Sequence, residues 1–431
     1  MRPRILATMF AAAIGLAGCS GGSGTSSAPT PSDRSSPVDL GRISLTAAQL
    51  HSLAADDGAF AGDLFASVAD ARPGNVVMSP ASVALALQMA YAGARGDTAT
   101  EMAKVLHVRG VAPTEVAAAA ARFLDDLAPL ADDKDALLSL VNQVWVQDGF
   151  PLTTSYRTAM GSGFGAAFRR ADFIADAESA RQDINAAVAD ATHDRIQDLL
   201  APGVLTDATR LVLTNAVYLR ARWASEFSPG DTSAEAFHLS DGTAADVDTM
   251  QQEESFRYVH REGYQAVVLP YVGGRLAMTV LVPDGSSLDP LLGALRHRGL
   301  AALTAGAKRT LVELHLPRFR FSWDADLSGP LGALGMPTAF TPDADFSGIT
   351  PAQRLHIQFV QHKAFVAVDE QGTEAAAATA VGVGVTGVMV PPPHPVVVRA
   401  DHPFLFAITD TTTHLPLFLG RVADPRSTVD R

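Results

Sequence analysis

The feature that most constrains the fold is a long Ala-, Gly- and Val-rich segment late in the chain. It reads EQGTEAAAATAVGVGVTGVMVPPPHP, from Glu370 to Pro395. Residues 355–368 before it have the composition of a long β-strand, and residues 403–422 after it form an apolar hairpin that has to be buried. The segment is therefore a loop held in the core at both ends. Loops longer than about 15 residues are usually functional or disordered.

A helix and a linker are two alternatives for this segment. The alanine-rich part, Glu374–Ala380, is shorter than the roughly 12–15 residues that an isolated helix needs. A linker joins domains, whereas only the buried hairpin and a short tail follow here. If the loop were cut, its upstream half would stay tethered to the preceding strand. Thr373, Ala375, Ala377 and Thr379 alternate along the chain and are all small, so this half could enter a packed sheet without overfilling it.

The rest of the chain predicts an α+β fold, with helices early, strands late and a large antiparallel or mixed sheet. The apolar patterns predict helices at 46–70, 98–107, 113–129 and 176–200 and strands at 76–78, 137–147 and 210–220. Ser79 and Pro80 are typical of the N-cap and first residue of a further helix. Because no linker or fixed-period repeat interrupts residues 38–431, we expect one mixed domain there.

The N-terminus is typical of an exported lipoprotein. Arg2 and Arg4 precede an apolar stretch that is too short to span a membrane, which predicts a secretory signal over residues 1–18. The Leu-Ala-Gly-Cys sequence ending at Cys19 resembles a bacterial lipobox, so we expect lipidation of Cys19, a flexible tether over residues 19–37 and a cell-envelope location outside the cytoplasm. The alternative is an ordinary signal with an incidental cysteine. As the only cysteine, Cys19 leaves the chain without a disulfide of its own.

Composition and motifs argue against an enzyme or a nucleic-acid-binding protein. The formal net charge is −13, and no basic run could neutralise phosphates. A GxGxxG pattern at Gly382, Gly384 and Gly387 is followed by prolines instead of a helix, and a GxSxG pattern falls in the N-terminal tether. The histidines are scattered singly, which is typical of core residues. We therefore predict no catalytic residue, no cofactor and no metal.

Further motifs resemble the serpin family, in the family's order, along nearly all of residues 46–425. The resemblance is strongest for EQGTEAAAATA, which is similar to the family's reactive-loop hinge, and weak for DFSGIT taken alone. The other motifs are NVVMSPASVALALQMAYAGARGDTATEM, LVLTNAVYLRARWASEF, LPRFRF, HKAFVAVDE and ADHPFLFAI with PLFLGRVADP. The resemblance implies a metastable fold of three β-sheets and about nine helices, with an exposed reactive loop at about residues 371–398.

The resemblance also implies a suicide inhibitor of serine or cysteine proteases. A target protease attacks the loop and forms an acyl-enzyme, and the cut loop then inserts into the central sheet and drags the protease with it. The alternative is a non-inhibitory serpin-like surface lipoprotein, a binding module whose loop is a simple protease substrate. Thr373 and the alanines after it favour inhibition, because non-inhibitory relatives often carry bulky or charged hinge residues. A surface hydrolase is a third alternative, and no nucleophile–base pattern supports it.

Roles for individual residues follow from the same resemblance. The hinge comprises Gly372, Thr373, Glu374, Ala375, Ala376, Ala377, Ala378 and Thr379. The shutter, where the central sheet parts, comprises Ser79, Ser82, Asn215 and His362, and simple hydrogen bonding in the core is an equal alternative for each of them. The breach, where insertion begins, comprises Trp223 and an ion pair between Arg318 and Glu370.

Counting from the hinge places the scissile bond between Thr386 and Gly387. Val385–Thr386 and Met389–Val390 are alternatives, because the loop is longer than in most relatives and contains three consecutive prolines. These flanks are small or aliphatic, and no Arg or Lys lies between Gly372 and Arg399. We therefore expect an elastase- or subtilisin-like partner with an apolar primary pocket. A monomer is expected, although an insertable loop also permits loop-into-sheet polymers.

Overall fold

The computed structural model describes residues 47–131, 133–374 and 394–426, which all belong to one compact unit. The predictions for the signal, the tether and Cys19, for hinge residues Ala375–Thr379 and for every candidate scissile bond lie outside the described residues. Within the described ranges, no helix has the length and apolarity that crossing a membrane requires.

Eight α-helices form in the described residues. They are α1 (Ala47–Ala71), α2 (Pro80–Tyr91), α3 (Gly96–Val105), α4 (Pro113–Leu127), α5 (Thr154–Thr158), α6 (Ala177–Ala191), α7 (Asp289–Leu303) and α8 (Ser328–Leu334). Helix α7 consists of two helical pieces, because Gly299 has a left-handed φ of 71°. Short 3-10 or π turns are η1 (Ala128–Leu130), η2 (Ala159–Gly163), η3 (Pro229–Asp231) and η4 (Pro337–Phe340).

The strands form two hydrogen-bonded sheets, which confirms the predicted α+β class. The six-stranded sheet runs in the order β10 (Phe319–Asp326), β11 (Gln361–Asp369), β12 (Gly372–Thr373), β4 (Leu211–Arg222), β2 (Ala136–Gln147), β3 (Ala167–Ala171). The nine-stranded sheet runs in the order β1 (Val76–Met78), β15 (Pro416–Val422), β14 (Phe404–Asp410), β8 (Leu276–Pro283), β7 (Tyr264–Pro270), β6 (Ala244–Arg261), β9 (Lys308–Pro317), β13 (Val396–Arg399), with β5 (Ser233–His238) also on β6.

The strand β6 explains why two sheets stand where three were expected. Its first part pairs with β5 and β9, and its end, Arg257–Arg261, pairs with β7. Two of the expected sheets are therefore one continuous sheet joined through a single long strand of 18 residues.

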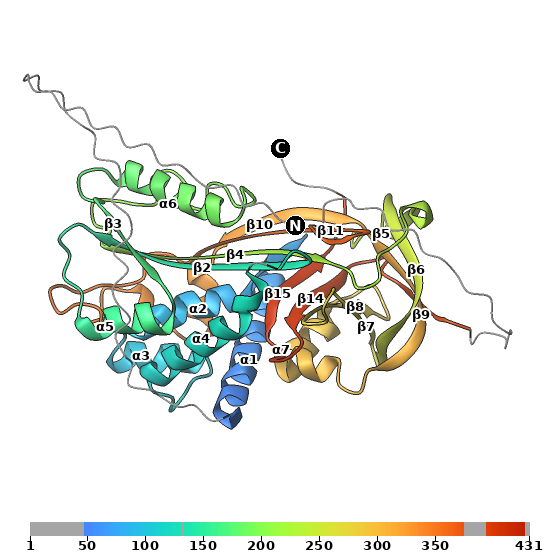
Figure 1. Ribbon diagram of the computed structural model, residues 1–431, viewed down its shortest axis with the longest axis horizontal. Helices are drawn as coiled ribbons and strands as arrows, with labels where there is room; N and C mark the ends of the chain where they lie inside the picture. The colour runs from blue at the N-terminus through green and yellow to red at the C-terminus, as the bar shows by residue number, and fades with distance from the viewer. Residues whose placement is uncertain (1–46, 132, 375–393, 427–431) are drawn as a thin grey trace, which may run out of the picture. The chain divides into compact units, whose positions relative to one another are not determined.

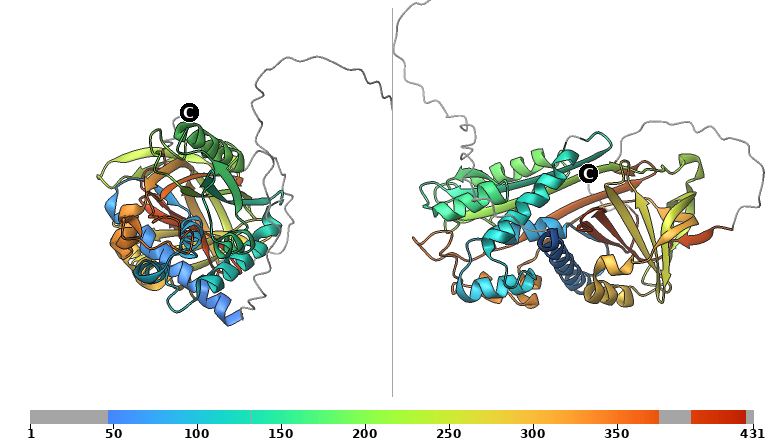
Figure 2. Two further views of the ribbon diagram at one scale, coloured as in Figure 1. Left: turned by 90° about the vertical axis from the view of Figure 1, so that its left-hand side faces the viewer. Right: turned by 60° about the horizontal axis from the view of Figure 1, so that its bottom comes forward.

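The six-stranded sheet lies between α6 on one face and a layer of helices that includes α2 on the other (Figure 1; Figure 2). Successive side chains of β4 point to opposite faces of the sheet, so the strand packs against both helix layers. Ala216 packs in a small apolar cluster with residues of α6, whereas its neighbour Val217 belongs to the main hydrophobic core.

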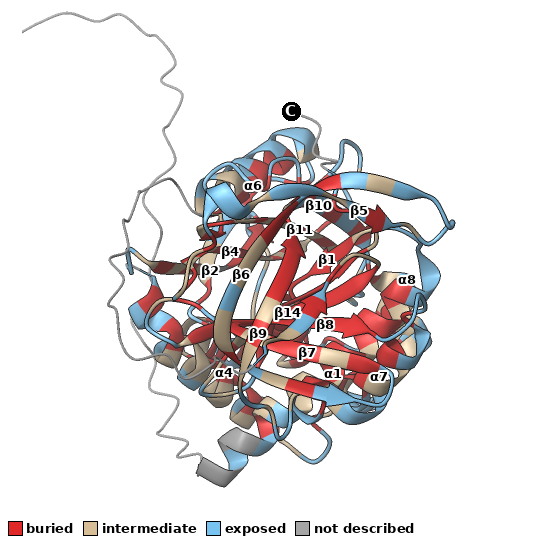
Figure 3. Cartoon of the chain, turned by 90° about the vertical axis from the view of Figure 1, so that its right-hand side faces the viewer, coloured by how far each residue is buried: buried red, intermediate tan, exposed pale blue. Residues whose placement is uncertain are grey.

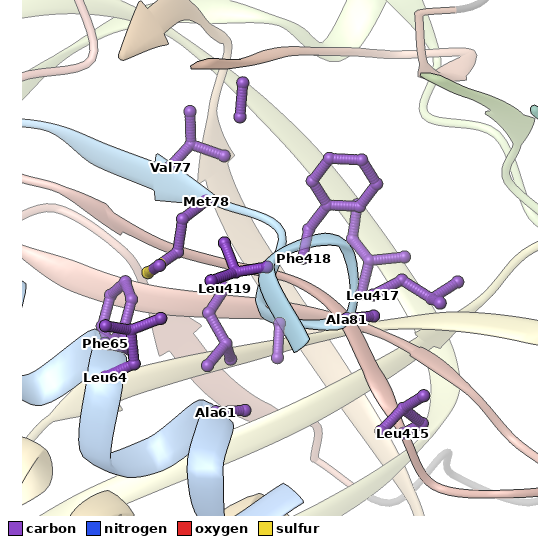
Figure 4. Packing of buried hydrophobic residues seen from close by; sticks show 14 of the residues in the cluster. Ala61, Leu64, Phe65, Val77, Met78, Ala81, Leu415, Leu417, Phe418 and Leu419 are labelled. Atoms are coloured by element: carbon purple, nitrogen blue, oxygen red, sulfur yellow. The ribbon is translucent and has the colours of Figure 1, made fainter. Parts of the chain in front are cut away.

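The C-terminal hairpin occupies the centre of the nine-stranded sheet, where β14 and β8 are coloured as buried along most of their length (Figure 3). Every residue of β15 is buried, and β15 pairs with β1 and β14. Leu417 and Leu419 pack in the core with Leu64 and Phe65 of α1 (Figure 4). The predicted buried hairpin is confirmed.

Two predicted boundaries are wrong. Helix α6 ends at Ala191 and not near residue 200, because the Thr192 hydroxyl donates to the Val188 carbonyl at 2.8 Å and His193 and Asp194 have left-handed φ values of 50° and 62°. The strand predicted from residue 355 begins only at Gln361. The amides before it bond elsewhere, as the Ile357 N–H does to the Ala339 carbonyl at 2.9 Å.

Candidate functional site

The beginning of the long loop is part of the six-stranded sheet. Gly372 and Thr373 form β12, which pairs antiparallel with β11 on one side and with β4 on the other. Gly372 is needed here, because a Cβ atom would lie 2.0 Å from the Ala221 carbonyl oxygen. Thr373 faces the interior: it is 3% exposed, and its hydroxyl oxygen lies 2.6 Å from that of Tyr271.

The predicted breach residues surround this point. The Trp223 indole N–H donates to the Asp369 carbonyl at 2.9 Å, and its ring stacks on Tyr271 with centroids 4.6 Å apart. The backbone N–H of Trp223 donates to the Gln371 carbonyl at 2.9 Å. Trp223 thus fixes both the backbone at the start of the loop and the tyrosine that contacts Thr373.

The expected ion pair between Arg318 and Glu370 is formed. Arg318 Nε donates to Glu370 Oε1 at 2.7 Å, and the Thr232 hydroxyl donates to the same oxygen at 2.5 Å. Burial alone would raise the pKa of Glu370, but these donors outweigh it and hold the pKa below its ordinary value. Glu370 is therefore a charged anchor at the residue where the chain leaves β11.

Glu374 is the last hinge residue in the described part of the loop, and it has a left-handed φ of 52°. Its carboxylate contacts the Arg195 guanidinium, on the segment that follows α6, and forms a hydrogen bond with Tyr218 of β4. Burial raises the pKa of Glu374, and the charge of Arg195 partly offsets this effect. The N–H of Glu374 still donates to the Ala367 carbonyl of β11 at 2.9 Å.

The four predicted shutter residues lie in one hydrogen-bonded cluster. The backbone N–H of Ser79 donates to His362 Nε2 at 3.1 Å, and the Ser79 hydroxyl caps α2 by accepting from the Ser82 N–H at 3.2 Å. The Ser82 hydroxyl donates to the Asn215 amide oxygen, and Asn215 in turn donates to Asn142. The cluster therefore connects α2 with β11, β4 and β2.

His362 is neutral in this cluster. Burial lowers its pKa to about 4, and its Nε2 atom accepts a hydrogen bond from a backbone N–H, which only the unprotonated nitrogen can do.

A cavity of about 180 Å³ continues the line of β12 between β4 and β11. Each of these strands pairs with β12, and no pairing joins them directly within the described residues. The cavity is lined from β4, from the start of β11 and the segment before it, and from α2, including Leu213, Asn215, Leu355, His362, Ser82 and Leu87. A space beside three of the predicted shutter residues thus lies further along the same two strands that flank β12.

The segment that follows α6 crosses the outer face of the sheet at this position. The Lys363 ammonium group of β11 donates to the Gln197 carbonyl at 2.7 Å, and the His193 ring lies 4.7 Å from the Tyr218 ring of β4. The Arg195 guanidinium lies 5.8 Å from the Phe365 ring of β11. Residues 192–198, which we call the α6 strap, therefore connect β4 and β11 on the side opposite α2.

Sequence reasoning missed four partners at this site: Tyr271, Arg195, Tyr218 and Asn142. They come from β2, β4, the residue after β7 and the α6 strap. Tyr218 lies inside the motif LVLTNAVYLRARWASEF, but nothing local to any of the four indicates its partner. Among the described residues, no group of His, Cys, Asp and Glu side chains is placed to hold a metal ion.

The sequence and fold are shared with one protein family. Residues 55–425 match the Serpin (serine protease inhibitor) family. The chain is 37% identical over 369 residues to an uncharacterised serpin-like protein of Thermococcus kodakarensis, covering 85% of this chain and 84% of that protein. It is 35% identical over 389 residues to the leukocyte elastase inhibitor of Sus scrofa, covering 87% of this chain and 100% of the inhibitor.

Solved structures agree with this assignment. The native state of the thermophilic serpin tengpin has a TM-score of 0.78 at 27% identity, covering 89% of this chain and 98% of tengpin. Cleaved Serpin 42Da has a TM-score of 0.77 at 27% identity, covering 89% of this chain and 100% of the other. The chain belongs to the serpin family, whose members include protease inhibitors.

Proposed function

We propose that this protein is a suicide inhibitor of serine or cysteine proteases that traps its target by inserting the cleaved loop between β4 and β11. One observation carries the proposal: β12 already lies between these strands, and a cavity bordered by three of the shutter residues lies further along them. Before cleavage, a cavity is thus present where the far end of a longer β12, from about Thr379 onward, would lie.

The register of β12 supports insertion of the hinge. Thr373 lies opposite Val368 of β11 and Ala221 of β4, so each further residue moves one position back along both neighbours. An extended β12 would bring Thr379 between His362 and Asn215, two of the shutter residues. The inward positions would be taken by alanines and a threonine, side chains small enough for a closed core.

The chemistry of trapping would proceed in two stages. The nucleophilic oxygen or sulfur of the protease attacks the scissile carbonyl, forms an ester or thioester, and releases the new amino terminus on the C-terminal side. That released end remains anchored through β13 and β14, whereas the acylated end is free to follow β12 into the sheet. Insertion would satisfy the N–H and C=O groups of the new strand and would move the attached protease.

The finer parts of the proposal come from the sequence. The small or aliphatic residues around Thr386 and Gly387 favour an elastase- or subtilisin-like target. Lipidation at Cys19 would anchor the protein as a monomer in the cell envelope, with the inhibitory domain outside the cytoplasm.

The first experiment incubates residues 36–431 separately with elastase and subtilisin and follows both by denaturing electrophoresis. We expect a complex that survives denaturation, together with a C-terminal peptide whose mass identifies the scissile bond. Clean cleavage without a complex for both proteases would support the alternative, a binding module whose loop is a simple substrate. A melting curve of the nicked product then tests insertion directly, because a loop that inserts after cleavage stabilises the fold even when the protease escapes.

A further inference from the structure

A second cavity lies away from the insertion site, between α1, α2 and α4. Its volume is about 80 Å³, which is room for roughly five water-sized groups. Most of its wall is apolar and comes from Leu53, Ala84, Val116, Ala119, Phe123 and Leu415. The ion pair between Arg122 and Asp126 of α4, with nitrogen and oxygen 3.0 Å apart, also borders it, and the 60% exposed Arg122 side chain marks its solvent side.

Two carboxyl groups line this space: that of Asp126, which is paired with Arg122, and that of Asp57 on α1. The Oδ1 atom of Asp57 accepts a hydrogen bond from the Gln88 amide of α2 at 2.9 Å. No Lys, Arg or His nitrogen among the described residues lies within ion-pair distance of it. A carboxylate in an apolar cavity without a cation is costly, since neither water nor a counter-charge compensates it fully.

The charged groups around Asp57 leave its charge uncompensated. Asp56 on the same helix repels it, and Arg122 and Asp126 on α4 are already paired with each other. Gln88 on α2 and Thr413, which follows β14, are neutral. Burial, with a smaller contribution from Asp56, raises the pKa of Asp57 to about 7.

We propose that this cavity binds a small organic cation: a primary ammonium group on a short apolar body. The ammonium group would pair with the Asp57 carboxylate, and the body would replace water against Leu53, Ala84 and Phe123. A metal ion is a poor alternative occupant, because a hard cation needs about six oxygens. The wall offers two carboxylates, of which Asp126 is already paired with Arg122, together with one amide and one hydroxyl.

Helix α2 connects this cavity with the insertion site. Ala81, Ala84, Leu85 and Gln88 line the cation cavity, whereas Ser82, Val83, Ala86 and Leu87 line the cavity between β4 and β11. A ligand shifts an equilibrium only through different affinities for its two states. A cation that fits the present position of α2 would favour the uninserted state and slow loop insertion. This second step rests on the proposed function, whereas binding itself does not.

Calorimetric titration of the full-length protein with n-butylammonium chloride at pH 8 tests binding without any protease. We expect saturable binding at one site, and at least tenfold weaker binding of n-butanol, which has a similar body and no charge. Affinity should fall about tenfold between pH 8 and pH 6, because the ionised fraction of a group with a pKa of about 7 falls by about that factor.

Three variants sharpen this test. Asp57→Asn, which keeps the shape of the wall, and Ala119→Leu, which fills the cavity and keeps the charge, should each weaken binding at least tenfold. The matched control Asp56→Asn changes the neighbouring carboxylate, which does not line the cavity, and should bind within a factor of two of wild type at pH 8. A thermal melt of each variant checks that it is folded.

The binding proposal is overturned if n-butylammonium gives no saturable heat, if n-butanol binds equally well, or if Asp57→Asn binds as wild type does. The coupling through α2 is overturned separately if a saturating amine leaves the rate of inhibition of a target protease unchanged. Failure of inhibition altogether would count against the proposed function and leave the calorimetric result standing.

Discussion

Thr373 is the first loop side chain that the sheet buries, and its surroundings define what the proposed insertion would require. Its hydroxyl shares a hydrogen bond with Tyr271, and the ring of Tyr271 is covered by Trp223. The site thus accepts one small side chain with one polar atom. It offers no carboxylate within hydrogen-bond distance of Thr373 among the described residues, so a cation there would be unpaired.

If the protein inhibits as proposed, we expect Thr373→Arg to convert it into a substrate. The buried guanidinium would cost on the order of several kcal/mol, which stalls insertion while cleavage of the loop continues. The ratio of cleaved protein to stable complex on a denaturing gel measures the change. Thr373→Ala is the matched control, since it keeps a small side chain, and it should trap nearly as well as wild type. Undiminished trapping by the arginine variant would contradict the insertion account.

We expect the hydrogen-bonded cluster around His362 to be sensitive to acid. Its folded pKa of about 4 lies below the usual 6.5, so the folded state resists protonation more than the unfolded chain does. Above about pH 6.5 His362 is neutral in both the folded and the unfolded state, and the folded state has its full stability. As the pH falls towards 4, the unfolded chain is protonated first, and the free energy of unfolding falls by up to about 3 kcal/mol for this shift. Unfolding by urea at pH 7 and pH 4.5 should show a smaller loss of free energy in His362→Gln than in wild type. An equal loss in both proteins would show that a group other than His362 causes the acid sensitivity.

The sequence was sufficient to find those site residues that belong to motifs, and insufficient for their partners. Ser79, Ser82, Asn215 and His362 were each marked by a recognisable stretch, and the structure brings them into one cluster. Asn142 completes this cluster from the neighbouring strand β2, at a position set only by the β2–β4 register, in which Asn142 lies opposite Asn215. Long-range register of this kind is a property of the folded sheet, and no local pattern encodes it.

The α6 strap contacts both the last described hinge residue and the two strands that flank β12. It contacts Glu374 through Arg195, β4 through His193 and β11 through Gln197. Three of its residues, His193, Asp194 and Asp198, have left-handed backbone conformations, which cost energy in residues other than glycine. The contacts with β4 and β11 therefore hold the strap in place. These are the two strands between which the cleaved loop would insert.

We expect Arg195→Ala to loosen the hinge in the uncleaved protein. Without the guanidinium, the half-buried Glu374 carboxylate loses its counter-charge, and the hydrogen bond from its N–H to the Ala367 carbonyl should open more often. Hydrogen exchange of a peptide covering residues 369–374 should be several-fold faster. Arg122→Ala, which removes a surface ion pair on α4, is the control and should leave this peptide unchanged. Identical exchange in all three proteins would show that the strap does not restrain the hinge.

Element types were predictable, whereas element ends and sheet membership were less so. The helices α1, α3 and α4 and the hairpin β14–β15 agree with the periodicities, because each buries one regular apolar face or, for the hairpin, both. The end of α6 and the start of β11 depend on contacts with distant loops. The joining of two expected sheets into one depends on β6, a strand long enough to have different partners along its length.

For the whole molecule, the proposed function requires that the cleaved form be more stable than the intact form. An inserted loop would add backbone hydrogen bonds on both sides and fill the cavity between β4 and β11. We therefore expect the melting temperature of the purified nicked protein to exceed that of the intact protein by well over ~10 °C at the same pH. Calorimetry of both forms measures this difference, and equal melting temperatures would show that cleavage is not followed by insertion.

The position of the C-terminal hairpin also bears on how the chain reaches its fold. Its last strand, β15, lies between β1 and β14, and Arg421 on β15 donates to the carbonyls of Ala69 and Gly74 near the other end of the chain. A growing polypeptide therefore has no partner for β1 until translation is almost complete. The nine-stranded sheet can therefore close at β1 only after nearly the whole chain has been synthesised, which makes this closure a late step of folding.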